Sequence, residues 1–532
     1  MVAALLRVVH GGMQDSKLLT RKGRPDPRFF VRAFVRAGRF TTQWVRLDFD
    51  TRPALGTTAT ITLPRKGHLI SRLYLVTTMP DIAAAQLAAR AWCQANGKTF
   101  AGPTFGWTNS LGHALVSSAE IAIGGTRVEA IDGRLMEVLD EYYTPLEKVP
   151  VVDRLLQRNS TDFRPASVGR DTVTQAVTPL PFWFSNGDAG TFLPIDAIQA
   201  DPVKVSVTFA APGTLYTSTG QVAPPSVAGA NVAPPAGGEA YFPIAGSPFY
   251  YAAVAPEGRD VAGLTGNPGQ ATRVAPVPSI TMPTVAQLVA LGDTYLMAEY
   301  VYLDRPEANR FRIADIQVPV LQHYAFEPVD TLGSSAANCY LKIPNPTRNL
   351  FFYLQRYEAP YWNAPFLATR DLSGGALGLP SPAGAPTPWW PDASRIDPRV
   401  YRDLVPGFLD RPSEPVDSIQ LVYEGSLVRH STGAPSLFRS LVPALEQRKS
   451  PWVNRYYYNL PFALQSGHLA PSQPCGEANL DKITKINLQL GLRPYAGYSE
   501  ATAVPRYRVY VWAETYNVLR VYGGRAGMMF GY

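Results

Sequence analysis

The chain has 532 residues, of which 46% are hydrophobic and only 17% are charged, and it contains 49 Pro, 43 Gly and 27 Tyr. This balance favours strands and turns over long charged helices, and the length allows two or three domains. The net charge of +7 arises from 49 basic and 42 acidic residues, which excludes the dense one-sided charge typical of nucleic-acid binders.

A basic amphipathic segment comes first along the chain. Arg28, Arg32 and Arg36 recur at helical spacing, with Phe30 and Phe34 between them. Arginines in this pattern could contact phosphate or lipid head groups. The alternative, which we favour, is a helix whose aromatic side chains close the end of a sandwich while its arginines pair with acidic neighbours.

Strand patterns dominate the rest of the chain. Val45, Leu47 and Phe49 alternate with polar residues, and the same period continues in residues 59–63 before a turn leads into LISRLYLV. A period of two is the signature of a strand with one buried face. Helical patterns are short and fall at 28–36, 82–95 and 134–143. The sequence therefore predicts an all-β protein with a few short helices.

The predicted helix at 134–143 carries an acidic group. Its members are Asp132, Glu137, Asp140 and Glu141. Paired carboxylates could in principle serve glycoside chemistry. On a short helix such a group is more typical of a solvated face, and this is the interpretation that we favour.

Other catalytic, metal or modification signals are weak. The histidines show no metal-binding spacing, and isolated surface positions or core positions with satisfied hydrogen bonds are expected for His10, His68, His113, His323, His430 and His468. No G-x-S-x-G motif marks a catalytic serine. We predict no catalytic residue, no cofactor and no metal site. The sequon Asn159-Ser160-Thr161 makes Asn159 a candidate for glycosylation.

Strand patterns occur twice along the chain. The aligned pairs, in chain order, are AEIAIGGTRVE at 119–129 with SIQLVYEGSLVR at 418–429, LPFWFSNG at 180–187 with LPFALQSG at 460–467, and AEYVYL at 298–303 with AETYNVL at 513–519. The second alignment runs on at constant spacing to Asp201 and Asp481. Three pairs in the same order predict two copies of one all-β unit, which suits a Greek-key sandwich or a jelly roll.

Two stretches rich in Pro, Gly and Ala interrupt these copies, at 210–293 and 370–415. Because both also contain aromatic residues, we expect surface loop insertions rather than linkers. The predicted organisation is an N-terminal arm at 1–27, a first unit at 28–312 and a second unit at 313–532.

The end of the chain is predicted to be the last strand of the second copy. Tyr507, Val509 and Val511 alternate along it. Gly523 and Gly524 would then allow a sharp bend, after which residues 528–530 are expected to tuck under the sandwich.

Several segments, in the correct order, resemble the major capsid proteins of nucleocytoplasmic large DNA viruses, the double jelly-roll family. They are GGMQDSKLLT with DPRFFVRAFVR, RKGHLISRLYL, AEIAIGGTRVE, LPFWFSNGDAGTFLPIDAIQADPVKVSVTF, EYVYLDRPEANRF, IPNPTRNLFFYLQ and YVWAETYNVLRVYGGRAGMMFGY. The motif PSQPCGEANLDKI departs from the family pattern, since it keeps Pro471, Ser472 and Cys475 but lacks the polar centre.

The resemblance implies two consecutive eight-stranded jelly rolls and a structural role without catalysis. Three chains would close into a pseudo-hexameric capsomer, and capsomers would tile an icosahedral shell. Further partners would be minor capsid and penton proteins, with no specific nucleic acid. Arg28, Arg32 and Arg36 would lie on the inner face, near minor capsid proteins or an inner membrane. The protein would be assembled in the host cytoplasm and reside in the virion capsid.

Two other functions stay open. A carbohydrate-binding or carbohydrate-active β-sandwich protein would use the many Tyr and Trp residues and the acidic group. A minor capsid protein would usually have a single jelly roll, so the duplication favours the major protein.

Overall fold

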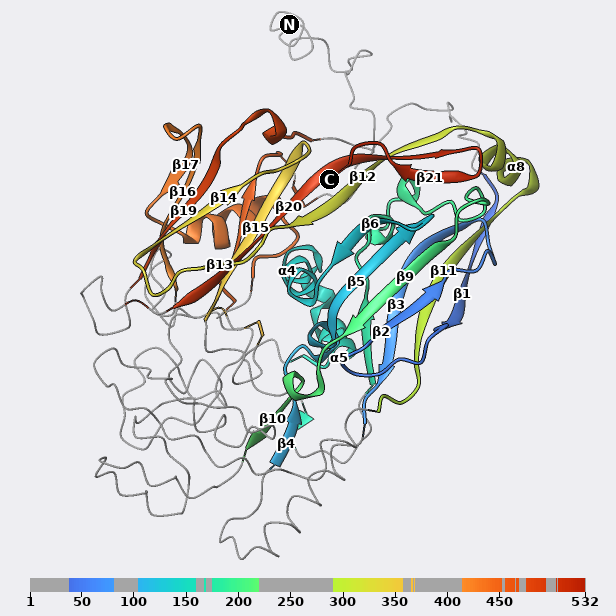
Figure 1. Ribbon diagram of the computed structural model, residues 1–532, viewed down its shortest axis with the longest axis horizontal. Coiled ribbons are helices and arrows are strands. Elements are labelled where there is room, and N and C mark those ends of the chain that lie inside the picture. The colour runs from blue at the N-terminus through green and yellow to red at the C-terminus, as the bar shows by residue number, and fades with distance from the viewer. Residues whose placement is uncertain are drawn as a thin grey trace, which may run out of the picture. The chain divides into compact units, whose positions relative to one another are not determined.

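The computed structural model describes residues 38–80, 104–158, 167–168, 175–219, 290–356, 365–366, 368, 414–451, 455–464, 466–467, 475–493, 504 and 506–531. Strands predominate in these ranges, and the helices between them are short (Figure 1). Within them, no helix combines the length and apolar character needed to cross a membrane.

The first half of the chain forms a sandwich of two four-stranded sheets (Figure 1). One sheet has the order β1-β11-β3-β8 and the other β2-β9-β5-β6. These strands are β1 (Phe40–Asp48), β2 (Thr58–Thr62), β3 (Leu69–Thr78), β5 (Val116–Ile123), β6 (Thr126–Ile131), β8 (Gln175–Pro179), β9 (Val203–Phe209) and β11 (Thr294–Leu303). A small third sheet joins β10 (Tyr216–Thr219), β4 (Thr104–Trp107) and β7 (Ser167–Val168).

The second half repeats this architecture. Its sheets have the orders β12-β20-β15-β18 and β14-β19-β16-β17. Their strands are β12 (Ile316–Ala325), β14 (Ala336–Leu341), β15 (Thr347–Arg356), β16 (Val416–Tyr423), β17 (Leu427–Thr432), β18 (Tyr457–Pro461), β19 (Ile486–Leu492) and β20 (Tyr507–Tyr522). The long strand β20 also pairs with β13 (Val329–Asp330) and β21 (Arg525–Met528).

The strand order identifies both halves as jelly rolls. In each, the last long strand lies between the first strand and a strand from the middle of the unit, β11 between β1 and β3, and β20 between β12 and β15. This crossing order is that of a jelly roll. Alternating burial explains the fold, because β9 and β19 each send every second side chain into the core between the two sheets. The predicted all-β fold with two eight-stranded jelly rolls is therefore confirmed, and the halves are called roll 1 and roll 2 below.

The duplication extends to the irregularities of the strands. The β5–β6 register shifts after Ile121, and the β16–β17 register shifts after Leu421, its aligned partner. Ala298 lies opposite Leu73 on β3, and Ala513 lies opposite Leu350 on β15, with a bulge one residue further on in both rolls. Matching bulges in matching places show that the two rolls are copies of one unit.

The predicted constant spacing between the copies does not hold throughout. Phe209 of β9 pairs with Val116, and Leu492 of β19 pairs with Val416. Because these two pairs are equivalent, residues can be counted back from them. Roll 2 has more residues between its LPFALQSG segment and β19 than roll 1 has between LPFWFSNG and β9, so the alignment of Asp201 with Asp481 is wrong.

Helix α4 (Gly133–Tyr143) confirms the helix predicted at 134–143. The Asp132 side chain caps it by accepting a hydrogen bond of 2.9 Å from the Leu135 amide. Other described helices include α3 (Leu111–Leu115), α5 (Val149–Leu156), α8 (Arg305–Ile313), the π-helical turn η7 (Leu437–Leu441) and α9 (Val442–Glu446). The helices predicted at 28–36 and 82–95 lie outside the described residues.

The chain end differs from the expectation. Gly523 and Gly524 have positive φ angles of 58° and 79° and form the turn of a β20–β21 hairpin. Met529 and Phe530 are 49% and 52% exposed, so they do not plug roll 2, whereas Met528 is half-buried and packs against the core. The hairpin is favoured because the backbone N–H and C=O groups of β21 can form hydrogen bonds with the end of β20, which extends beyond β15.

The predicted domain limits are only partly visible. The arm at 1–27 and most of the insertions at 210–293 and 370–415 lie outside the described residues. The predicted division after residue 312 falls within α8, and we keep it as a proposed boundary.

Gly133 fixes the start of α4, and its replacement tests that role. A Cβ atom there would collide with the backbone oxygens of His113 and Val116. We expect Gly133→Ala to lower the free energy of unfolding by about 1–3 kcal/mol, as overpacking does. The measurement is denaturant unfolding followed by fluorescence. Gly527→Ala is the control, because a Cβ there meets nothing within 4 Å, and equal losses in both variants would contradict the prediction.

Candidate functional site

Helix α4 of roll 1 packs directly against roll 2 (Figure 1). The Tyr142 and Phe351 ring centroids are 5.4 Å apart. The Arg134 guanidinium lies 4.7 Å from the centre of the Tyr510 ring, a cation–π contact. Phe351 and Tyr510 belong to β15 and β20, so α4 covers the outer face of the sheet β12-β20-β15-β18.

Carboxylates on α4 form the first part of a buried charge cluster. Arg158 lies 2.5 Å from Asp140 and 2.7 Å from Asp153. The His113 Nδ1 atom is 2.7 Å from a Glu137 oxygen. All of these residues belong to roll 1, and the Glu137 and Arg158 side chains have no exposed surface.

The second part of the cluster crosses to roll 2. Lys449 Nζ lies 3.0 Å from Glu141, and Arg455 Nε lies 3.3 Å from another oxygen of Glu141. Arg455 also pairs with Glu137 through Nη1. We call Glu137, Asp140, Glu141, His113, Asp153, Arg158, Lys449 and Arg455 the inter-roll charge cluster.

The cluster keeps Glu137 and Asp140 ionised. Burial alone would raise the pKa of Glu137, but Arg455, Arg158 and His113 hold it well below its ordinary value. Burial likewise opposes ionisation of Asp140, and Arg158 reverses the effect and lowers its pKa. A general acid in glycoside hydrolysis needs the opposite, a raised pKa. The electrostatics therefore favour a structural role for Glu137 and Asp140.

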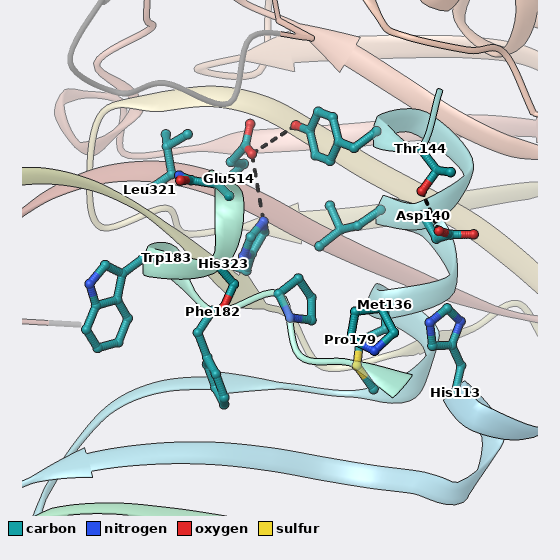
Figure 2. A pocket seen from close by; sticks show the side chains of 15 residues that line it. His113, Met136, Asp140, Thr144, Pro179, Phe182, Trp183, Leu321, His323 and Glu514 are labelled. Atoms are coloured by element: carbon teal, nitrogen blue, oxygen red, sulfur yellow. Dashed lines mark hydrogen bonds and ion pairs between the residues drawn. The ribbon is translucent and has the colours of Figure 1, made fainter. Parts of the chain in front are cut away.

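A second polar group joins the rolls next to this cluster (Figure 2). The Tyr143 hydroxyl donates to Glu514 at 2.9 Å, and the Asn349 amide donates to the same carboxylate at 2.6 Å. His323 of β12 lies 3.2 Å from Glu129 of β6 and 3.8 Å from Glu514. Burial lowers the pKa of His323, but the two glutamates outweigh burial and raise it above 6.5.

A pocket of about 220 Å³ opens between these polar groups and the loop after β8. Figure 2 shows His323 and Glu514 on one side of it, with Phe182, Pro179 and Met136 nearby. The lining is mainly apolar, and the Glu514 carboxylate already has partners in Tyr143 and Asn349. Among the described residues, no group of three or more His, Cys, Asp and Glu side chains is arranged to hold a metal ion.

The structure corrects the favoured interpretation of the acidic group. Glu137 and Glu141 are fully buried and Asp132 caps the helix, so this is not a solvated face. The physical reason is that α4 lies between two rolls, a tertiary effect that helical spacing does not reveal. His113 is a buried histidine whose partner is Glu137, as expected of a satisfied core histidine, and His323 pairs with Glu129. Arg28, Arg32, Arg36 and Asn159 lie outside the described residues, and their roles stay predictions.

The sequence reasoning missed the basic partners and Glu514. Arg158, Lys449 and Arg455 lie in irregular segments where no pattern marks them. Glu514 did carry a signal, because it is the charged residue in the apolar strand YVWAETYNVL and it aligned with Glu299.

Loss of a cation from the cluster should be costly. In Arg455→Met, Glu137 and Glu141 lose a buried partner, and we expect a loss of about 3–5 kcal/mol in the free energy of unfolding. Urea denaturation measures it. Arg312→Met is the matched control, since Arg312 pairs with Asp196 at 2.7 Å on the surface and should matter little. A similar small effect of both substitutions would refute a structural role for the cluster.

The stabilising contribution of His323 should be lost at alkaline pH. A histidine whose pKa is raised on folding stabilises the native state fully below its ordinary pKa of 6.5, and this contribution disappears as the pH rises through the folded value. Between about pH 6 and about pH 9 we expect the melting temperature to fall more in the wild type than in His323→Gln. The groups that face His323 are Glu129, Glu514 and Arg348.

His430→Gln is the control for this measurement. Burial lowers the pKa of His430, so its removal, unlike that of His323, should not lessen the fall in melting temperature as the pH rises. Parallel melting curves for the wild type and His323→Gln would contradict the prediction.

Comparisons with known proteins agree with the fold. The sequence matches the family described as major capsid protein N-terminus over residues 28–236. It also matches the family described as large eukaryotic DNA virus major capsid protein over residues 312–527.

Individual relatives are distant. The major capsid protein of Frog virus 3 is 21% identical over 533 residues, covering 95% of this chain and 93% of the relative. The major capsid protein of Pyramimonas orientalis virus is 27% identical over 210 residues, 39% of this chain and 47% of the relative. Probable capsid protein 4 of Acanthamoeba polyphaga mimivirus is 24% identical over 39% of this chain and 38% of the relative. The chain thus matches less than half the length of the last two.

Solved structures support the fold alone. A chain from the PBCV-1 virus capsid superposes with a TM-score of 0.62 at 17% identity, covering 95% of this chain and 100% of that one. The Faustovirus major capsid protein gives a TM-score of 0.55 at 10% identity, covering 97% and 96%. Models of the major capsid protein match both rolls, one over residues 28–236 and the other over residues 312–527. This chain therefore belongs to the major capsid proteins of large eukaryotic DNA viruses, which form the virion capsid.

Proposed function

We propose that three copies of this chain close into a pseudo-hexameric capsomer and that capsomers tile an icosahedral shell. The observation that carries the proposal is the duplication, in which strand order and bulges repeat between roll 1 and roll 2. Three chains then supply six similar units, so a three-fold assembly can occupy a position with six neighbours. Closed cyclic symmetry is the common solution for such assemblies.

The inter-roll charge cluster supports this role by holding the two rolls as one building block. A shell subunit must present its surfaces in a fixed relation, because small errors accumulate over a lattice. Buried ion pairs between Glu141 and both Lys449 and Arg455 penalise any displacement that separates them. In this proposal the energy of assembly comes from broad contacts, and the chain performs no catalysis.

Other elements of the proposal rest on the resemblance to the family. Minor capsid and penton proteins would be partners, and the segment with Arg28, Arg32 and Arg36 would face them or an inner membrane. Assembly would take place in the host cytoplasm. Glycosylation of Asn159 and the limits of the N-terminal arm and of the two rolls belong to the same set of proposals.

Native mass spectrometry of the purified chain tests the function. We expect a complex of three times the chain mass of 58.1 kDa, with a hexagonal outline in negative-stain images. The trimer should persist on dilution to low micromolar concentration, as obligate interfaces do. A monomer at all concentrations would overturn the proposal.

A further inference from the structure

The outer face of the roll 2 sheet has a counterpart in roll 1. The matching bulges align Glu514 with Glu299. Counting back along each strand, Trp512 aligns with Met297 and Tyr510 with Tyr295. On the neighbouring strand Phe351 corresponds to Tyr74, since each lies opposite Trp512 or Met297. The two faces are therefore equivalent positions of one unit.

Their surroundings differ. In roll 2 the face is covered by α4, and Phe351, Trp512 and Glu514 are 0%, 2% and 1% exposed. In roll 1 the corresponding Tyr74, Met297 and Glu299 are only half-buried. Tyr74 belongs to β3, and Met297 and Glu299 belong to β11, its neighbour in the sheet (Figure 1).

The roll 1 face has the composition of an interface. The Trp44 and Tyr74 ring centroids are 5.6 Å apart, and the Trp44 residue is 44% exposed. The Arg46 guanidinium lies over the Tyr295 ring at 4.0 Å. Aromatic residues, Met and Arg are the types enriched in protein interfaces. We call Trp44, Arg46, Tyr74, Tyr295, Met297 and Glu299 the open face.

Roll 2 has a counterpart of the covering helix. In roll 1, α4 follows β6 directly, and in roll 2 the segment η7–α9 follows β17. The apolar residues of α4 are buried against the rolls, whereas Leu441 and Leu445 of η7–α9 are 42% and 78% exposed. Within the described part of the chain, no helix covers the sheet face of roll 1 as α4 covers that of roll 2, and Leu441 and Leu445 of η7–α9 are not covered by a sheet.

We propose that the η7–α9 segment of one chain docks on the open face of a second copy, repeating between chains the contact that α4 makes with roll 2 within the chain. This inference rests on the proposed trimer and names its contact surfaces. The arrangement is head-to-tail, since each chain offers two different surfaces, and such contacts form a closed ring when the rotation between copies permits.

The test uses two variants that each damage one surface. Met297→Asp places a charge on the open face, and Leu445→Asp places one on the helical segment. Each should weaken chain association about a hundredfold, the effect of losing an interface hot spot. Tyr340→Asp is the control, because Tyr340 is a 79% exposed aromatic residue on β14, in the other sheet of roll 2.

Mixing the two variants gives the sharper result. Met297→Asp keeps an intact helical segment and Leu445→Asp keeps an intact open face, so one sound contact remains between them. Native mass spectrometry should then show a one-to-one complex that grows no further, while Tyr340→Asp remains trimeric. A one-to-one complex also shows that both variants are folded.

Trimers in both single variants would overturn the inference while leaving the proposed function intact, whereas a monomeric wild type would remove the function itself. If either aspartate variant fails to fold, Trp44→Asp and Leu441→Asp probe the same two surfaces. Their residues are 44% and 42% exposed, and trimers in both of these variants would also overturn the inference.

Discussion

The contact between α4 and the outer sheet of roll 2 is the constraint on which the rest of the structure depends. Its aromatic part, Tyr142 against Phe351, removes apolar area from water and supplies stability without strong direction. Its charged part supplies direction. Buried ion pairs such as Glu141 with Lys449 give little net stability because desolvation opposes them. A shifted contact, however, would leave charges buried without partners, and this penalty selects one arrangement of the two rolls.

The duplication shows how one unit meets two different demands. At the same bulge, Glu514 is buried and accepts hydrogen bonds from Tyr143 and Asn349, while Glu299 is half-buried and accepts one of 2.7 Å from Ser71 within its own roll. The backbone geometry was retained and the side chains around it diverged. Trp512, which is larger than Met297, and Phe351, which is less polar than Tyr74, fill the face that is permanently covered. The smaller or more polar set stays on the face that water still reaches.

Much of this fold could be predicted, and the reason is local. Period-two alternation and paired turns around Gly125 and Gly425 are properties of neighbouring residues, so they revealed strands and their duplication. The inter-roll charge cluster could not be predicted in the same way. Glu137 looks like a surface residue on its helix, and its partner Arg455 lies in an irregular segment far along the chain. Only tertiary packing brings them together. The hairpin at Gly523 was missed because the pairing of β21 depends on how far β20 extends beyond its neighbours.

The contact within the chain and the proposed contact between chains differ in burial, and this difference implies an order in which they would form. Roll 2 has apolar side chains on both faces of its β12-β20-β15-β18 sheet, since Phe352 faces its own core and Phe351 faces α4, each with no exposed surface. That sheet needs roll 1 to cover it, so the contact within the chain forms as part of folding. The open face of roll 1 is half-exposed and carries Arg46 and Glu299, which remain compatible with water. If chains associate there, as proposed, a folded chain can exist before it assembles, and the weaker contact can form and break while a lattice corrects its errors.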